Sequence, residues 1–140
     1  MNKNDYFMQI AQTCAIKSID PDSKFGCIAV NDSGSILSTG YNGPPRNVDD
    51  SKIPLTRPEK YVYMEHAERN CIYNAARIGV SLNGCTFYVT GIPCIDCLRA
   101  MYQVGAKKIY CLDVKAKMHN VDEFMDFINQ YMEIEIWKLC

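Results

Sequence analysis

Two short clusters in the sequence combine residue types that bind metals and move protons. Residues 66–68 read His-Ala-Glu, and residues 93–97 read Pro-Cys-Ile-Asp-Cys. A Cys-x-x-Cys pair at the start of a helix points both sulfurs toward one spot, where the positive end of the helix dipole lowers the thiol pKa values. The imidazole of His66 would complete a set of three zinc ligands and leave the fourth position to water, as in catalytic zinc sites.

The charges of these groups indicate a role for each of them. Thiolates at Cys94 and Cys97 and a neutral His66 cancel the charge of Zn²⁺, so a bound water stays under a Lewis acid strong enough to bring its pKa toward neutrality. Glu68 follows His66 by two positions, which makes it an awkward fourth ligand but places it beside the water. We therefore predict that Glu68 moves protons between that water and a substrate.

Each cluster also has an ordinary interpretation when it is taken alone. Cys94 and Cys97 could form a redox pair, and His66 could be a hydrogen-bonded structural histidine. Together, however, the clusters match the H-x-E…P-C-x-x-C signature of zinc deaminases, which favours that class of enzyme. The other histidine, His119, lies in a polar stretch and is expected at the surface.

The composition is typical of one soluble globular domain that covers residues 1–140. Hydrophobic residues make up 48% and charged residues 22% of the chain. The net charge of −1 provides no field that would attract a nucleic acid or an anionic membrane, and no apolar run has the length of a membrane span or the form of a signal peptide. We therefore expect a cytoplasmic protein, in the host cytoplasm if a phage encodes it, with neither kind of partner.

The eight cysteines are not expected to form a disulfide framework, because such frameworks belong to small secreted chains. Cys140 is terminal and carries no signal. The five cysteines outside residues 93–97 and the terminus have apolar neighbours and are expected to be small buried hydrophobes: Cys14, Cys27, Cys71, Cys85 and Cys111.

Apolar spacing predicts the elements that must position the two clusters. A helix over 5–18 comes first, followed by strands over 25–30 and 35–41 joined by a hairpin turn, and then by a proline-rich loop over 42–58. The rest alternates: helices over 66–78, 94–104 and 121–131, and strands over 85–90, 107–113 and 133–137. This alternation predicts an α/β fold, a three-layer α/β/α domain with a five-stranded mixed sheet.

Over almost its whole length the sequence resembles the short deoxycytidylate deaminases of bacteriophages and bacteria. The resemblance rests on residues 66–70 (HAERN) and 93–97 (PCIDC), and also on residues 18–27 (SIDPDSKFGC) and 40–45 (GYNGPP). It implies a cytidine-deaminase-like fold and hydrolytic deamination of dCMP to dUMP, in which zinc-bound hydroxide attacks C4 of the cytosine with Glu68 as proton shuttle.

Related families fit less well. Nucleoside cytidine deaminases use a cysteine where His66 stands, and riboflavin-type deaminases space their two cysteines more widely than Cys94 and Cys97. Deaminases that edit adenosine in tRNA share both clusters and remain the alternative function, but they need a basic surface, which the net charge of −1 does not favour.

The resemblance also implies how the substrate is bound. Asn42 would hydrogen-bond the sugar, the backbone N–H of Ala67 would meet the base carbonyl, and the backbone carbonyl of Ile92 would accept the exocyclic amine. Ser23 and Lys24 are the first candidates for the 5′-phosphate and Arg46 is a weaker one. Ordinary solvated charge is the alternative for Lys24 and Arg46.

The same resemblance implies a homo-oligomer, a hexamer, whose activity is regulated. It implies that dCTP activates the enzyme and dTTP inhibits it, and that Mg²⁺ accompanies the bound triphosphate. One zinc is expected per chain, because Met64 stands where some phage relatives have a histidine for a second, structural zinc. Alternatively, the glycines only shape a loop and the arginines are ordinary solvated charges. The candidate regulatory residues are Gly40, Tyr41, Asn42, Gly43, Arg46, Arg69 and Arg77.

Overall fold

The computed structural model describes residues 1–114 and 120–138, so His119 and Cys140 lie outside the described residues. Within these described residues, four helices and five strands follow one another, with two short 3₁₀ turns in between. In order they are α1 (Lys3–Ala15), β1 (Gly26–Val30), β2 (Ile36–Tyr41), η1 (Asp50–Lys52), η2 (Glu59–Val62), α2 (Ala67–Ile78), β3 (Thr86–Val89), α3 (Ile95–Gln103), β4 (Lys108–Leu112), α4 (Val121–Ile128) and β5 (Glu133–Trp137).

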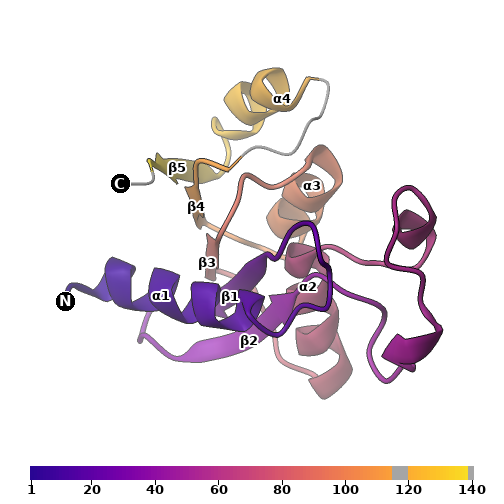
Figure 1. The fold of residues 1–140 in the computed structure, drawn as a ribbon. Helices are drawn as coiled ribbons and strands as arrows, with labels where there is room; N and C mark the ends of the chain where they lie inside the picture. Colours follow the sequence, from indigo (N-terminus) through magenta and orange to yellow (C-terminus); the bar gives the residue numbers. More distant parts are fainter. Residues whose placement is uncertain (115–119, 139–140) are drawn as a thin grey trace.

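The five strands form one mixed sheet in the order β2-β1-β3-β4-β5. β1 pairs antiparallel with both β2 and β3, whereas β3, β4 and β5 run parallel to one another. The parallel part arises where a helix crosses over between consecutive strands, first α3 and then α4 (Figure 1). The predicted five-stranded mixed sheet is therefore confirmed.

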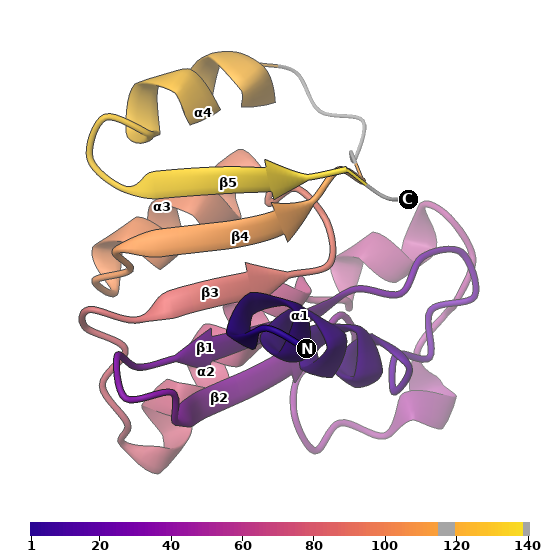
Figure 2. The same ribbon diagram turned by 90° about the vertical axis from the view of Figure 1, so that its left-hand side faces the viewer.

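Helices cover both faces of the sheet. α1 crosses one face over β1, β2 and β3, while α2 and α3 lie behind the sheet in the view of Figure 2. Successive residues of β1 serve the two layers in turn, since Cys27 and Ala29 pack in the larger core with α2, α3 and α4, whereas Ile28 and Val30 pack under α1. This confirms the predicted three-layer α/β/α arrangement.

The ends of some elements differ from the predicted ones. α1 begins two residues earlier than predicted because the Asn2 side chain caps it, accepting a hydrogen bond from the backbone N–H of Asp5 at 2.9 Å. α4 ends at Ile128 rather than 131, since the Asn129 side chain instead accepts a hydrogen bond from the backbone N–H of Ile134, in β5. The predicted proline-rich loop contains η1, and irregular chain with η2 continues almost to α2.

Burial of the cysteines largely follows the prediction. Cys27, Cys71, Cys85 and Cys111 are buried, and Cys14 on α1 is half-buried. Burial raises the pKa of the Cys85 thiol, and likewise that of Cys111, to about 12, which keeps both protonated and unreactive at neutral pH. These cysteines therefore act as core residues.

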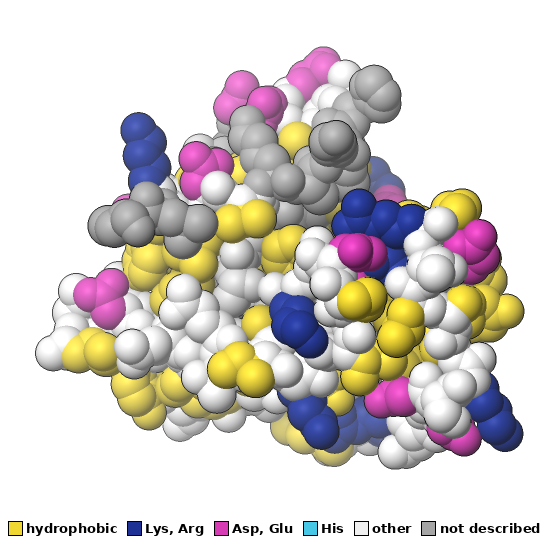
Figure 3. All heavy atoms as spheres, viewed as in Figure 1, with side chains coloured by type: hydrophobic (Ala, Val, Ile, Leu, Met, Phe, Trp, Pro, Cys, Tyr) yellow, Lys and Arg dark blue, Asp and Glu magenta, His cyan; other side chains and the backbone are white. Residues whose placement is uncertain are grey.

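The surface shows charges of both signs. On the face drawn in Figure 3, Lys and Arg side chains lie in separate groups with Asp and Glu among them, so no continuous basic band crosses that face. Among the described residues, no helix has both the length and the apolar character that a membrane span requires.

Candidate active site

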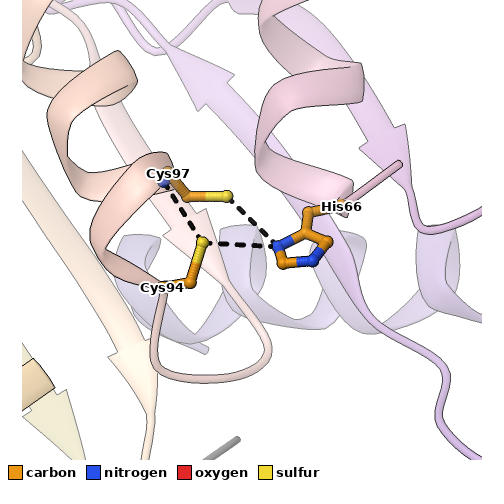
Figure 4. A group of neighbouring side chains, drawn as sticks. All are labelled: His66, Cys94 and Cys97. Atoms are coloured by element: carbon orange, nitrogen blue, oxygen red, sulfur yellow. Dashed lines mark hydrogen bonds between the residues drawn. The ribbon is translucent and has the colours of Figure 1, made fainter. Parts of the chain in front are cut away.

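The two sequence clusters meet at the starts of two neighbouring helices. His66 is the residue that precedes the first turn of α2, and Cys94 holds the same position before α3. The Cys94 sulfur accepts a hydrogen bond from the backbone N–H of Cys97 at 3.3 Å, which fixes this sulfur at the α3 N-terminus. Because α2 and α3 pack against each other, the imidazole reaches this point from the neighbouring helix (Figure 4).

The three side chains converge on one point. Nδ1 of His66 lies 3.4 Å from the sulfur of Cys94 and 3.4 Å from the sulfur of Cys97. Among the described residues this is the one group of three metal-binding side chains whose ligand atoms all lie within 4.8 Å of one another. Figure 4 shows both sulfurs pointing at the same ring nitrogen.

The spacing of the donor atoms fits a zinc ion. Tetrahedral zinc with ordinary Zn–S and Zn–N bonds separates a sulfur and a nitrogen ligand by about 3.5 Å, close to the 3.4 Å observed here. The two cysteines are buried while His66 is exposed, so the donors open to solvent on the imidazole side. Three N and S donors with access for water are the pattern of a catalytic rather than a closed structural zinc site.

Electrostatics favour a thiolate at this site. A hydrogen bond from the Cys97 side chain is the main cause that lowers the pKa of Cys94. Hydrogen bonds from His66 and from the backbone N–H of Cys97 lower it further. Together these bonds outweigh burial and bring the pKa of Cys94 to about 4. The pKa of Cys97 is raised, first by the same hydrogen bond and then by burial. The hydrogen bond to Cys94 raises the pKa of His66. The donors therefore carry negative charge suited to a metal cation.

Glu68 lies in the first turn of α2, beside the donors but not among them. Its side chain is 6% exposed, and this burial raises its pKa despite the opposing influence of His66. A carboxyl group whose pKa is moved toward neutrality can both accept and donate a proton near pH 7. The structure thus has a buried carboxyl group beside the metal-binding side chains, and proton transfer by Glu68 stays a prediction.

A second layer of charged residues joins the two helix starts. Oε1 of Glu65 accepts hydrogen bonds from the backbone N–H of His66 at 3.0 Å and from Nε of Arg69 at 2.6 Å. Arg69 also lies 3.7 Å from Oδ2 of Asp96, in the first turn of α3. Arg69, predicted as a regulatory residue, therefore contacts Glu65, which is hydrogen-bonded to the backbone of His66, and Asp96, which lies between Cys94 and Cys97 in the sequence. Sequence reasoning missed Glu65, because a glutamate at this position gave no pattern of its own.

Comparison with known proteins identifies the family. Residues 1–113 match the family described as the cytidine and deoxycytidylate deaminase zinc-binding region. The chain belongs to this family.

Two relatives carry the name of one enzyme. A probable deoxycytidylate deaminase of Caenorhabditis elegans is 38% identical over 117 residues, covering 81% of this chain and 58% of that protein. The Homo sapiens deoxycytidylate deaminase is 35% identical over 125 residues, covering 85% of this chain and 68% of that protein. The chain thus spans about three fifths to two thirds of the length of these relatives. The predicted resemblance to deoxycytidylate deaminases is confirmed.

A solved structure shares the whole arrangement. The dCMP deaminase of the cyanophage S-TIM5, in complex with dCMP and dUMP, is 26% identical, with a TM-score of 0.74 over 96% of this chain and 95% of that chain. The predicted cytidine-deaminase-like fold is therefore confirmed. Membership of the family also supports the prediction that the chain is an enzyme of the deaminase class.

In this deaminase family member, the Asn42 side chain is already bonded to the protein. Its Oδ1 accepts a hydrogen bond from the backbone N–H of Phe25 at 2.8 Å, and its Nδ2 donates one to the carbonyl of Ser23 at 2.9 Å. The amide retains one N–H and one lone pair for another partner. Asn42 therefore fastens the loop before β1 to the loop after β2.

The other predicted substrate contacts differ in burial. Ala67 and Ile92 are buried in the same core cluster as Cys94 and Cys97, and each is close in sequence to one of the metal-binding residues. Ser23 is half-buried in the loop before β1, while Lys24 is exposed and its ammonium donates to the carbonyl of Ser18.

The predicted regulatory residues do not all come together. A hollow of about 210 Å³ contains Tyr41 and Arg46 of that set, and Gly43 forms a backbone bridge to Glu65. Arg77 is exposed in the last turn of α2. The hollow is lined by Ile19, Tyr41, Pro44, Pro45, Arg46, Asn47, Val48, Asp50, Asn70 and Asn74.

The structure explains why a glycine stands at position 40, which the sequence did not reveal. A Cβ atom at this position would lie 2.4 Å from the backbone nitrogen of Cys71 and 2.5 Å from the carbonyl oxygen of Ala67. Glycine at 40 thus lets β2 pack directly against the start of α2.

Proposed function

We propose that this chain catalyses the zinc-dependent hydrolysis of dCMP to dUMP and ammonia. The observation that carries the proposal is the convergence of His66 with Cys94 and Cys97, with the buried carboxyl group of Glu68 beside them. The names of the curated relatives and the dCMP complex of the cyanophage enzyme favour this substrate over other cytosine compounds.

In the proposed mechanism His66, Cys94 and Cys97 would hold one zinc ion per chain. No second zinc is expected, because Met64 stands where some phage relatives have a histidine. The zinc ion supplies a Lewis acid that brings the pKa of water toward neutrality. Glu68 receives a proton from the attacking water and gives it to N3 of the cytosine. Glu68 then takes the second proton of the water, from the hydroxyl group now on C4, and gives it to the exocyclic amino group. The bond between C4 and that nitrogen breaks, ammonia leaves, and C4 keeps a carbonyl oxygen.

Recognition of the base is proposed to use mainly backbone groups. The N–H of Ala67 is one of the first in α2 and has no acceptor within the helix, so it is available for the base carbonyl. The carbonyl of Ile92 accepts the amino group, and Asn42 uses its remaining hydrogen-bonding capacity on the sugar. Ser23 and Lys24, with Arg46 as a weaker candidate, bind the 5′-phosphate.

Regulation is proposed to act through the loop over residues 40–45 and the hollow beside it. The polar groups of Tyr41, Arg46, Asn70 and Asn74 at the hollow suit a nucleotide triphosphate, with Mg²⁺ as its counter-ion. In the proposed hexamer dCTP activates and dTTP inhibits. Since Nδ2 of Asn70 donates to the carbonyl of Tyr41 at 2.8 Å, a ligand in the hollow contacts both α2 and the residue preceding Asn42.

Substrate choice tests the proposal directly. Ammonia release from dCMP, deoxycytidine and a tRNA anticodon stem-loop should be compared for the zinc-loaded protein. A clearly higher kcat/KM for dCMP is expected, and Ser23→Ala with Lys24→Ala should bring it toward the value for deoxycytidine. Equal kcat/KM for dCMP and deoxycytidine would indicate a nucleoside enzyme, and deamination of the stem-loop would favour the tRNA alternative.

A further inference from the structure

A lysine buried in an otherwise polar loop lies at the entrance to α2. Lys60 belongs to η2, and its side chain is 1% exposed. Its ammonium lies 2.8 Å from Oδ1 of Asp20 and 2.7 Å from Oδ2 of Asp22. A buried ammonium is tolerated only when it is paired and hydrogen-bonded, so this position requires both the lysine and its carboxylates. Nothing in the sequence pattern singled it out.

Asp20 connects the buried Lys60 ammonium to the loop before β1. The same oxygen that meets Lys60 accepts hydrogen bonds from the backbone N–H groups of Asp22 at 2.8 Å and Ser23 at 3.2 Å. Burial favours the neutral acid, but the hydrogen bond from Lys60 and those from the two N–H groups outweigh it and lower the pKa of Asp20. Asp20 is therefore ionised at neutral pH, and the ion pair with Lys60 sets the orientation of its carboxylate.

Further hydrogen bonds connect this loop back to the catalytic helix. The hydroxyl of Ser18 donates to the carbonyl of Asn42 at 2.7 Å, while the Asn42 side chain holds Ser23 and Phe25. One residue later, Gly43 exchanges two backbone hydrogen bonds with Glu65, at 3.1 and 2.7 Å, directly before His66. Residues 18–25, 42–43 and 60–66 thus form a closed set of contacts around the proposed substrate residues.

We infer that Lys60 is a positioning residue: through Asp20 it fixes the loop of Ser23 and Lys24 at the distance from the α2 start that a nucleotide 5′-phosphate requires. The inference rests on the proposed function. The ion pairs of Lys60 are with Asp20 and Asp22 and not with Glu68. Loss of the lysine is therefore expected to disturb substrate binding and to spare the chemical step. A neutral, unbranched side chain of similar length, such as methionine, would fill most of the space without directing the carboxylate.

The test compares Lys60→Met with a matched control. Met132→Ala removes a side chain that is 1% exposed in the larger core, near β5, and therefore lowers stability without touching this network. For Lys60→Met we expect KM for dCMP to rise roughly tenfold while kcat stays within about threefold and zinc content is unchanged. Met132→Ala should leave KM within about twofold. An unchanged KM in Lys60→Met, or an equal rise in Met132→Ala, would overturn the inference.

Amide hydrogen exchange provides a readout that does not depend on activity. In Lys60→Met the backbone amides of Asp22 and Ser23 should exchange faster, because their acceptor is no longer held, whereas Met132→Ala should leave them unchanged. Unchanged exchange would overturn the inference even if KM moved. If the wild type failed to deaminate dCMP while these amides behaved as expected, the proposed function would fail and the positioning network would stand.

A milder variant covers the case in which Lys60→Met does not fold. The Asp22 side chain is 43% exposed, so Asp22→Asn is expected to fold and removes one of the two charges that hold Lys60. KM for dCMP should rise by roughly threefold with kcat unchanged. An unchanged KM in this variant would also contradict the inference.

Discussion

Nδ1 of His66 lies 3.4 Å from the sulfur of Cys97, although 31 positions separate the two residues in the sequence. Two helix starts make this contact possible, since each helix presents its first side chains at the same end of the sheet. The donors come from different elements, so the site forms only when the sheet and both helices are in place. Metal binding and folding are therefore expected to be coupled.

The first prediction concerns the zinc ligands. Cys97→Ala should reduce the zinc content from about one ion per chain to a small fraction, because two protein ligands hold zinc poorly. Cys85→Ala is the matched control, since Cys85 is also buried but does not belong to the donor group. Metal analysis after dialysis decides the matter. Full zinc retention in Cys97→Ala, or two tightly held zinc ions in the wild type, would contradict the assignment.

The second prediction separates proton transfer from metal binding. Glu68→Gln should keep its zinc and lose roughly a hundredfold or more in kcat, because the amide cannot accept and return a proton. Thermal stability should not fall, since burial of the carboxyl group already works against its ionised form. Glu123→Gln, at an exposed position on α4, controls for the loss of a negative charge. Near-normal turnover in zinc-loaded Glu68→Gln would move the role elsewhere.

The chemistry-bearing clusters and the layered fold could be predicted because both depend on local patterns. His66, Cys94 and Cys97 lie at fixed distances from predicted helix starts, and alternating strands and helices require crossovers. The same local information places both ends of every strand within one residue of the observed bounds.

Long-range partners of polar residues could not be predicted in this way. Lys60 lies 40 positions from Asp20, and a lysine in a polar loop is ordinarily solvated. Asn42 was expected to bind a sugar, yet its amide also holds the backbone at Ser23 and Phe25, a pairing that depends on where two loops meet in space. Gly40 similarly depends on how closely α2 approaches β2.

The third prediction is a pH dependence of stability. The pKa of Asp20 is lowered in the folded chain, so its contribution is complete above the unfolded value of about 3.9 and is lost as the pH falls through the folded pKa. At neutral pH Asp20→Asn should destabilise the protein by on the order of 3 kcal/mol, because it leaves a buried ammonium with one carboxylate fewer. The free energies of unfolding of wild type and variant should converge as the pH falls below this range.

Denaturant unfolding at a series of pH values measures this difference. Asp126→Asn, at an exposed position on α4, serves as the control and should show a small difference that changes little with pH. A gap between wild type and Asp20→Asn that stays constant down to strongly acid pH would show that the carboxylate of Asp20 contributes nothing through its charge.

The last prediction concerns regulation through the hollow beside the loop over residues 40–45. dCTP with Mg²⁺ should raise the initial rate at low dCMP concentration and dTTP should lower it, since each effector can shift the population only as far as it prefers one arrangement. Arg46→Ala should weaken both effects, each measured as the ratio of the rates with and without the effector in the same variant, so that any change in the basal rate cancels. Arg77→Ala is the matched control, because Arg77 is exposed on α2 and does not line the hollow. Hyperbolic curves that neither triphosphate moves would refute regulation, and an equal loss in Arg77→Ala would place the effector site outside the hollow.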